Sequence, residues 1–203
     1  MPSSRPASSP FHDRLEPGRV YDASPLAQGD ISMFDAVTLR PLEEMLVPEH
    51  PRSGETDPAE CWHCQPAEST IWQDDLWQLR SGGLRTGLPF LGGFAPREHV
   101  LLEDAPLEVL AALGPLMQRL SNAVKQVPGV ARCHFGRWND GSAHLHLHAL
   151  ARPAGMMRAR GVNLAYWDDV LPPLEPRLQA ENIRIVARAM AEGGGKDLTG
   201  RGR

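Results

Sequence analysis

Residues 142–150, S-A-H-L-H-L-H-A-L, place three histidines at alternate positions with leucines between them. Successive side chains of a β-strand point to opposite faces, so this alternation predicts a strand. The apolar side chains then face a core together, and His144, His146 and His148 share the opposite face. A register shift of one residue would bury three imidazoles, so the leucines fix the register. The sequence therefore predicts a strand with one apolar face and one histidine face that is kept polar.

The residues around this strand predict an antiparallel sheet. Residues 130–138 form a partner strand, and the N-D-G that follows is a strong hairpin-turn signal. Residues 70–81 are typical of two short strands around a turn, and a further strand with a glycine pair precedes a turn at Pro96. These segments predict a sheet in which sequential strands are neighbours.

Two helices complete the predicted domain. The first lies within residues 103–129, where Asp104 is expected to cap it, G-P at 114–115 to kink it and P-G at 128–129 to end it. One face at helical spacing is formed by Leu110, Leu113, Met117, Leu120 and Val124. A second amphipathic helix spans roughly residues 176–191. Strands, helix, hairpin and helix in this order predict an α+β fold with an antiparallel sheet.

The chain divides into three predicted segments. Residues 1–57 are rich in Pro, Ser and Gly and form an N-terminal extension that we expect to be partly disordered. Residues 58–191 form the domain, including the C-terminal helix. Residues 192–203, G-rich and basic, are expected to be a flexible tail.

Charge and composition exclude several function classes. A net charge of −4 does not indicate a nucleic-acid-binding face, so no nucleic acid polymer is expected as a partner. No apolar run approaches the roughly 20 residues that span a bilayer, so no membrane association is expected. The first 18 residues lack the apolar segment of a secretory signal, and three cysteines suit a reducing compartment. We therefore expect a cytoplasmic protein.

A pair of cysteines supplies a second chemical clue. Cys61 and Cys64, in C-W-H-C, have the spacing with which two thiolates bind one zinc ion. His63 between them is a poorer ligand candidate because the loop would have to double back. His99 and the three alternating histidines could supply the other half of a Cys2His2 site. A redox role is the alternative, although no helix opens at the C-x-x-C as that motif requires.

These motifs together resemble the histidine triad family. The run from His144 to Leu150 fits the pattern His-apolar-His-apolar-His-apolar-apolar at every position. A C-x-x-C near the domain start and a Pro-x-x-His, from Pro96 to His99, before a long helix agree with it. The resemblance covers roughly residues 58–153 and implies the family's antiparallel sheet with a long helix and a C-terminal helix.

The resemblance implies an enzyme and assigns its residues. It implies a nucleotide hydrolase that cleaves at the α-phosphate of a nucleoside phosphoramidate or dinucleoside polyphosphate, through a nucleotidyl-histidine intermediate on His146. His148 would contact the reacting phosphate. One structural zinc ion per chain would be held by Cys61, Cys64, His99 and His144. A homodimer is also implied.

Some positions depart from the family pattern. Hydrolases of the family commonly carry Gln-Ser before the triad, where this chain has Asp140 and Gly141, with Ser142 displaced by one residue. We retain Asn139, Gly141 and Ser142 beside His148 as candidate phosphate-binding residues. Arg137 could reach an anionic ligand and Trp138 could stack on a base, although a solvated arginine and a packed tryptophan are the ordinary alternatives.

Three other functions stay open at this stage. A nucleotidyltransferase or phosphorylase of the same fold would pass the nucleotide from His146 to an acceptor other than water. A catalytically silent nucleotide-binding module would retain the fold without turnover. In a third alternative, all three triad histidines bind one catalytic metal ion.

Overall fold

The computed structural model describes residues 16, 18–22, 36–38, 41, 46–82 and 86–200 of the 203. The chain divides into two compact units, Met1–Pro51 and Arg52–Arg203. In the first unit, β1 (Val20–Asp22) and β2 (Ala36–Thr38) pair antiparallel. The second unit holds every predicted site residue and starts at Arg52, so it includes six residues that the sequence assigned to the extension.

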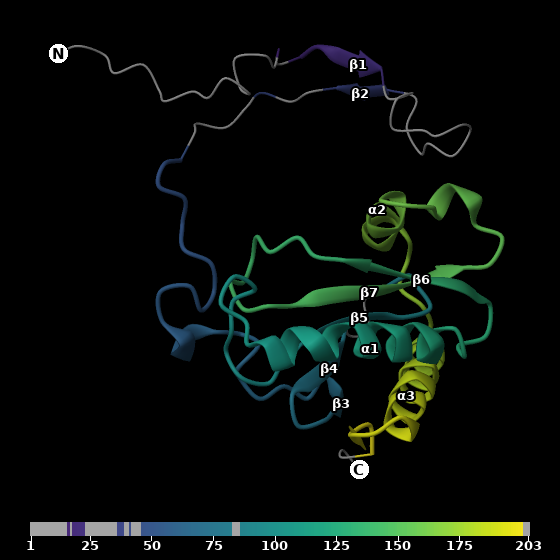
Figure 1. The fold of residues 1–203 in the computed structure, drawn as a ribbon. Coiled ribbons are helices and arrows are strands. Elements are labelled where there is room, and N and C mark those ends of the chain that lie inside the picture. Colours follow the sequence, from purple (N-terminus) through teal and green to yellow (C-terminus); the bar gives the residue numbers. More distant parts are fainter. Residues whose placement is uncertain are drawn as a thin grey trace. The chain divides into compact units, whose positions relative to one another are not determined.

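The second unit is built on one six-stranded antiparallel sheet with the strand order β6-β7-β5-β4-β3-β8 (Figure 1). Its strands are β3 (Thr70–Gln73), β4 (Trp77–Ser81), β5 (Leu91–Pro96), β6 (Val130–Gly136), β7 (Leu147–Pro153) and β8 (Lys196–Asp197). Its helices are α1 (Leu107–Val124), α2 (Asn163–Val170) and α3 (Pro176–Glu192), with short 3-10 turns at Pro58–Glu60 and Met157–Ala159. The predicted α+β class with an antiparallel sheet is confirmed.

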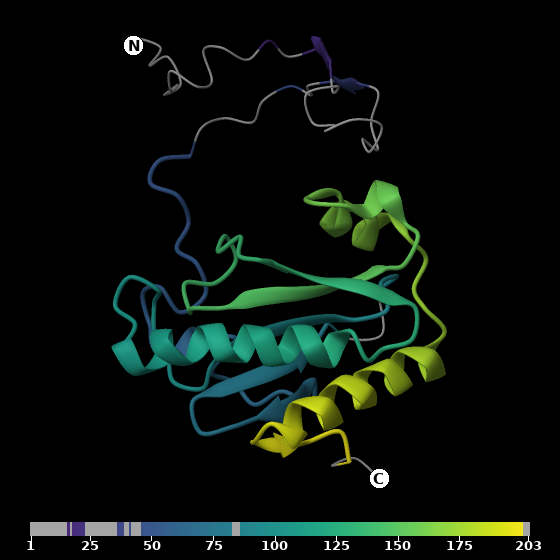
Figure 2. The ribbon, with the colours of Figure 1, turned by 45° about the vertical axis from the view of Figure 1, so that its right-hand side comes forward.

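The main core lies between the sheet and the pair α1 and α3, which pack on each other (Figure 2). The sheet contributes fully buried side chains to this core from three of its strands: Trp77 and Leu79 from β4, Phe94 from β5 and Ala149 from β7. A smaller cluster around Leu150 forms where α2 meets the other face of the sheet. Side chains of β4, β5 and β7 that point away from the main core therefore lie on this second face, where they can form a site.

Helix α1 differs from its prediction in its N-cap, in its buried face and in its end, which lies at Val124 rather than at 128–129. Its N-cap is Pro106, which makes no side-chain cap hydrogen bond, whereas Asp104 lies in a preceding turn in which its N–H donates to the Leu101 carbonyl. Pro106 at φ −56° already sets the backbone for helix entry. Val109 lies on the buried face of the helix, whereas Leu110 is 38% exposed. Pro115 lies inside one continuous helix.

The chain beyond α3 packs on the sheet, where the sequence predicts a flexible tail. Strand β8 pairs with β3, opposite Trp72 and Gln73. The Trp72 indole N–H donates to the carbonyl of Gly194 at 2.9 Å. Backbone pairing and one buried tryptophan hydrogen bond therefore order a segment whose composition alone is typical of disorder.

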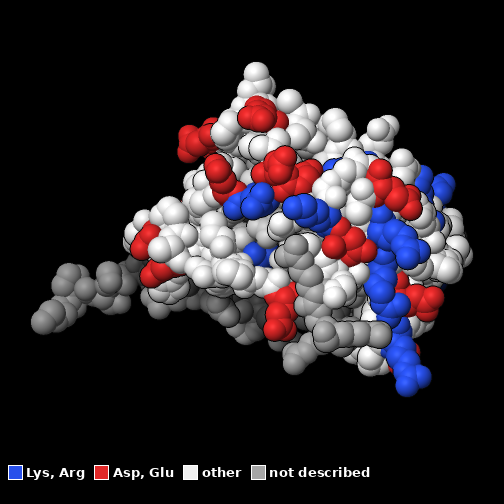
Figure 3. Space-filling view, turned by 90° about the horizontal axis from the view of Figure 1, so that it is seen from below, with Lys and Arg blue, Asp and Glu red and all other residues white. Residues whose placement is uncertain are grey.

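Acidic and basic side chains are interspersed over the face seen in Figure 3, with a basic band along one side. Among the described residues, no helix has the length and apolar character to cross a bilayer.

Candidate active site and metal centre

The three histidines lie where β7 begins and follow the predicted alternation. The hydrogen-bonded strand starts at Leu147, and His148 lies between Gly93 of β5 and Gly136 of β6. The segment before it is also extended against its neighbours, since the Leu145 N–H donates to the Val100 carbonyl at 2.7 Å. Leu145 points into the main core and the histidines point to the other face. The prediction of an apolar and a histidine face is therefore correct in register.

Two of the three histidines are buried and His148 is half-buried, which alternation alone does not predict. His144 is 0% exposed and His146 is 7% exposed. The cover is residues 61–65, here called the cysteine loop, whose His63 ring stacks on His146 with centroids 4.7 Å apart and planes at 25°. His144 and His146 can be buried in this way because a main-chain carbonyl accepts a hydrogen bond from each ring.

Two side chains from β4 hold the cysteine loop in place. The Arg80 guanidinium donates to the carbonyls of Trp62, His63 and Gln65 at 2.9, 2.8 and 2.6 Å. Gln78 donates to the His63 carbonyl as well, at 2.9 Å. Because these contacts use only backbone oxygens, the loop's side chains remain available for the site.

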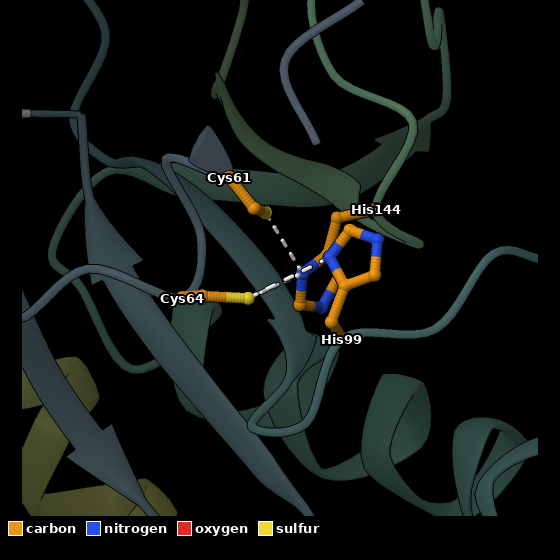
Figure 4. A group of neighbouring side chains, drawn as sticks. All are labelled: Cys61, Cys64, His99 and His144. Carbon is orange, nitrogen blue, oxygen red and sulfur yellow. Dashed lines mark hydrogen bonds between the residues drawn. The ribbon is translucent and has the colours of Figure 1, made fainter. Parts of the chain in front are cut away.

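Four side chains converge at the inner side of this loop (Figure 4). The ligand atoms of Cys61, Cys64, His99 and His144 all lie within 4.8 Å of one another. His144 Nδ1 is 3.3 Å from Cys61 Sγ and 3.5 Å from Cys64 Sγ, and His99 Nδ1 is 3.6 Å from Cys64 Sγ. Zinc–ligand distances in a tetrahedron place neighbouring N and S ligands about 3.6 Å apart. The predicted ligand set therefore assembles with the spacing of a Cys2His2 zinc site.

The ring of His144 is oriented for this role by a second contact. Its Nε2 lies 3.1 Å from the carbonyl of Pro96, which can only accept, so Nε2 carries the proton. Nδ1 then has the free lone pair and faces both thiols, the arrangement usual for a metal-binding histidine. Burial lowers the pKa of His144 to about 4 and keeps the ring neutral. Burial also raises the pKa of Cys64 to about 11 in the absence of a metal ion, so ion binding must displace a proton.

Within the described part of the chain, this is the one group of metal-binding side chains brought together. It includes His144 but neither His146 nor His148, so the three triad histidines do not form a common metal site here.

Gly54 is a site residue that sequence reasoning missed. Its φ is +76°, and a Cβ placed on it would lie 2.8 Å from both Cys61 Cβ and His99 Cε1. The adjacent Ser53 pairs with Ser142 and its N–H donates to the Gly141 carbonyl at 3.1 Å. Gly54 therefore lets the incoming chain close against two metal ligands. Nothing in a Pro, Ser and Gly-rich segment distinguishes this glycine beforehand.

His146 has a defined tautomer. Its Nδ1 lies 2.7 Å from the main-chain carbonyl of His144, so Nδ1 donates and the opposite ring atom, Nε2, carries the lone pair in the neutral ring. His148 lies edge-on to His146, with centroids 5.4 Å apart. Burial, then the neighbouring His146, lowers the pKa of His148, while burial lowers that of His63 to about 3. The nucleophile candidate is thus flanked on both sides by imidazoles whose neutral form is favoured.

The other predicted phosphate-binding residues lie in the connection between β6 and β7. Asn139 adopts φ 65° and its carbonyl accepts from Arg52 at 3.2 Å. Ser142 is buried and its hydroxyl donates to the Ser53 carbonyl at 3.2 Å. Gly141 lies beside the Trp62 ring. Their role in binding phosphate stays a prediction.

The sequence matches no family model and no curated protein. Several solved structures are similar in fold. A zinc-bound histidine triad family protein from Mycobacterium smegmatis is 22% identical, with a TM-score of 0.44 over 63% of this chain and 86% of its own. Histidine triad proteins are among the structures that this chain resembles.

A hypothetical histidine triad nucleotide-binding protein from Sulfolobus tokodaii is 14% identical, with a TM-score of 0.48 over 65% of this chain and 93% of its own. A uridylyltransferase mutant is 19% identical, with a TM-score of 0.41 over 66% of this chain and 48% of its own. All three TM-scores lie below 0.5, and these similarities concern the fold alone.

Proposed function

We propose that this chain is a histidine triad nucleotide hydrolase that acts on a nucleoside phosphoramidate or a dinucleoside polyphosphate through His146. The observation that carries this proposal is the hydrogen bond from His146 Nδ1 to the His144 carbonyl. In the neutral ring this hydrogen bond leaves the lone pair on Nε2, and a neutral imidazole with a free ring nitrogen is a good nucleophile.

The reaction would proceed in two displacements at the α-phosphorus. The lone pair of His146 Nε2 forms a bond to phosphorus, while the bond to the leaving group breaks and its electron pair departs with that group, which takes a proton from solvent. The ring then carries a positive charge that the hydrogen bond from Nδ1 to the His144 carbonyl stabilises. A water oxygen next bonds to phosphorus, the electron pair of the N–P bond returns to Nε2, and the water's proton leaves to solvent with release of the nucleoside monophosphate.

His148 is suited to stabilise the phosphate during both steps. Its depressed pKa keeps the ring neutral near pH 7, so one ring nitrogen bears a proton that can be donated to a phosphate oxygen. We further propose that N–H groups of Asn139, Gly141 and Ser142 contact the same phosphate. In this arrangement the charge that develops on oxygen meets donors fixed by the sheet.

The donor set Cys61, Cys64, His99 and His144 fits zinc, with no fifth protein ligand needed. A closed four-ligand site of this kind supplies positioning, since no open position remains for substrate. His144 then holds its main-chain carbonyl where it orients His146. Reduced thiols are required for this site, which supports a cytoplasmic location.

A cavity of about 900 Å³ beside His63 is suited to the nucleoside. Its lining includes His63, Gln78 and Arg80, and its size matches ordinary small-molecule sites. Because His63 lines this cavity and stacks on His146, a group bound against His63 would lie one ring away from the proposed nucleophile.

The test is intact-mass spectrometry of the zinc-loaded protein, quenched seconds after mixing with adenosine 5′-phosphoramidate or diadenosine tetraphosphate. We expect an acid-labile adenylyl adduct in the wild type and in His50→Ala, an exposed-histidine control, but none in His146→Ala. An adduct that persists in His146→Ala would refute the assignment of the nucleophile.

Product analysis separates hydrolysis from transfer. Adenosine monophosphate as product with and without added phosphate supports the hydrolase, whereas adenosine diphosphate formed from phosphate identifies a phosphorylase. Tight nucleotide binding with no product from either substrate would instead identify a silent binding module.

We also propose a homodimer. Strand β6 is at the end of the sheet, and its outer edge has no partner strand in the described part of the chain. An unpaired edge of seven residues is a template for strand addition. Light scattering coupled to size-exclusion chromatography tests this, with a dimer expected and a monomer at micromolar concentration contradicting it.

A further inference from the structure

A second cavity of about 900 Å³ lies beyond His148, between β6 and α2. Phe135, Arg137 and Trp138 line it from the end of β6, and Val162 and Tyr166 line it from α2 and the residue before it. Only the α2 side of this cavity lies beyond residues 58–153, the part of the chain that resembles the histidine triad family, whereas Arg137 and Trp138 lie within that part. The C-terminal region of this chain therefore closes one side of the cavity.

Four rings in succession connect this cavity to the cavity beside His63 and include His146, the proposed nucleophile. His63 stacks on His146 at 4.7 Å, His146 meets His148 at 5.4 Å, and His148 meets Trp138 at 5.1 Å between centroids. The cavity beside His63 lies at one end of this row and the cavity beside Trp138 at the other. A phosphorus atom bound at His146 would thus have a cavity on each side, one for the nucleoside and one for the group that leaves.

The second cavity offers aromatic and apolar surface. Trp138 is 51% exposed and Tyr166 53% exposed, although both are large enough to be packed in a core. Trp138 folds back over β6 because Gly136 has no side chain: a Cβ there would lie 2.7 Å from the indole ring. The ring is thereby held toward His148, with one surface open to stack on a planar ligand.

The same cavity contains an unsatisfied positive charge. The Nε and Nη2 atoms of Arg137 are buried and have no hydrogen-bond partner. Arg137 is half-buried as a whole, but N–H groups that are shielded from water and left unpaired are costly, and a carboxylate or phosphate that reached them would supply the missing acceptor. Aromatic surface and an unpaired arginine together specify an aromatic group that carries a negative charge.

We propose that this cavity binds the leaving group of the substrate, and that this group is aromatic and anionic. The inference rests on the proposed hydrolase function, because only a cleavage at His146 divides the ligand between the two cavities. An aromatic amino acid joined through its amine and a second nucleotide share this chemistry, and substrates can distinguish them.

The experiment compares kcat/KM for four adenosine 5′-phosphoryl substrates. Their leaving groups are ammonia, phenethylamine, phenylalanine and, in diadenosine tetraphosphate, a nucleotide. The ratio of kcat/KM for the phenethylamine derivative to that for the ammonia derivative, here called the ring ratio, measures the contribution of the aromatic ring. The ratio of kcat/KM for the phenylalanine derivative to that for the phenethylamine derivative, here called the carboxylate ratio, measures the contribution of the carboxylate. We expect both ratios to be about tenfold in the wild type, in keeping with one aromatic contact and one charged hydrogen bond. Preference for phenylalanine or for diadenosine tetraphosphate identifies the source of the leaving group.

Variants assign each ratio to its residue. Trp138→Ala should remove most of the ring ratio and Arg137→Met most of the carboxylate ratio, whereas the surface controls Leu178→Ala and Arg188→Met should keep both. Ratios near one in the wild type would overturn the inference. So would an equal loss on all substrates in Trp138→Ala, because the ring would then bind the shared nucleoside.

Failure of the proposed function is distinguishable from failure of this inference. If no substrate is cleaved, calorimetry on His146→Ala compares the phenylalanine derivative with the unsubstituted amide. Binding about tenfold tighter for the phenylalanine derivative supports the cavity without the reaction, and equal binding refutes the cavity assignment.

Discussion

Replacing Gly54 by alanine is the sharpest test of the metal centre. Two costs arise from one methyl group. An L-residue at a φ of +76° is strained by about 1–2 kcal/mol. The new Cβ would also lie 2.8 Å from Cys61 Cβ and from His99 Cε1, where carbon atoms in contact are normally about 3.5–4.0 Å apart. Both ligands must therefore retreat by about 0.7 Å or more, whereas metal–ligand distances tolerate only about 0.2 Å.

Gly129→Ala is the matched control. Gly129 has the same φ of +76°, but nothing lies within 4 Å of a Cβ placed on it, so this variant carries the strain without the contact. Gly129→Ala should lose about 1–2 kcal/mol of unfolding free energy and Gly54→Ala at least as much, measured by urea denaturation with zinc chelated. Only Gly54→Ala should also bind zinc about 10–100-fold more weakly, measured by competition with a chromophoric chelator. Wild-type zinc affinity in Gly54→Ala would refute the proposed ligand geometry.

Three further predictions concern the surroundings of the site. Arg80→Met removes three hydrogen bonds to carbonyls of the cysteine loop, so urea denaturation should show that the free energy of unfolding falls by about 2 kcal/mol. An unchanged denaturation midpoint would contradict this anchoring role. Burial lowers the pKa of His63 to about 3 and of His144 to about 4, so the unfolded chain binds more protons below pH 6.5. The free energy of unfolding of the zinc-free protein, measured by urea denaturation, should therefore fall as the pH falls from 6.5 toward 4, and it should depend less steeply on pH in His63→Phe. An unfolding free energy that does not change with pH over this range would contradict the prediction. Burial raises the pKa of Cys133 to about 12, so a thiol reagent at pH 8 should modify it slowly in the zinc-loaded native protein and readily after denaturation.

The parts of the fold that the sequence predicted correctly depend on local signals. The second amphipathic helix, expected at roughly 176–191, is α3 at Pro176–Glu192. The alternation of residues 142–150 predicted which side chains share a face, because strand periodicity is a property of consecutive residues. The four metal ligands were implied by a family resemblance, and the structure brings the same four together.

The missed features depend on contacts between distant segments. Alternation cannot say what covers the histidine face, and the cover comes from the cysteine loop about 80 residues earlier. Gly54 and Arg80 belong to no motif, since their importance arises from the ligands and carbonyls they meet only in the folded chain. The order of the segment after α3 was likewise invisible, because it depends on the edge of β3 and on Trp72.

His144 explains how a zinc site and a nucleophile can share one short strand. Its Nδ1 faces the two thiols, its Nε2 donates to the Pro96 carbonyl, and its own carbonyl accepts from His146. The contact between His144 and His146 spans two residues of extended chain, so the spacing of the motif itself selects the tautomer of His146, the proposed nucleophile. Fixing His144 at the metal centre therefore fixes the acceptor that keeps the proton on Nδ1 of His146. A metal ion held by these ligands would contribute through the position of one backbone carbonyl, and in the neutral ring of His146 the lone pair on Nε2 would need no separate general base.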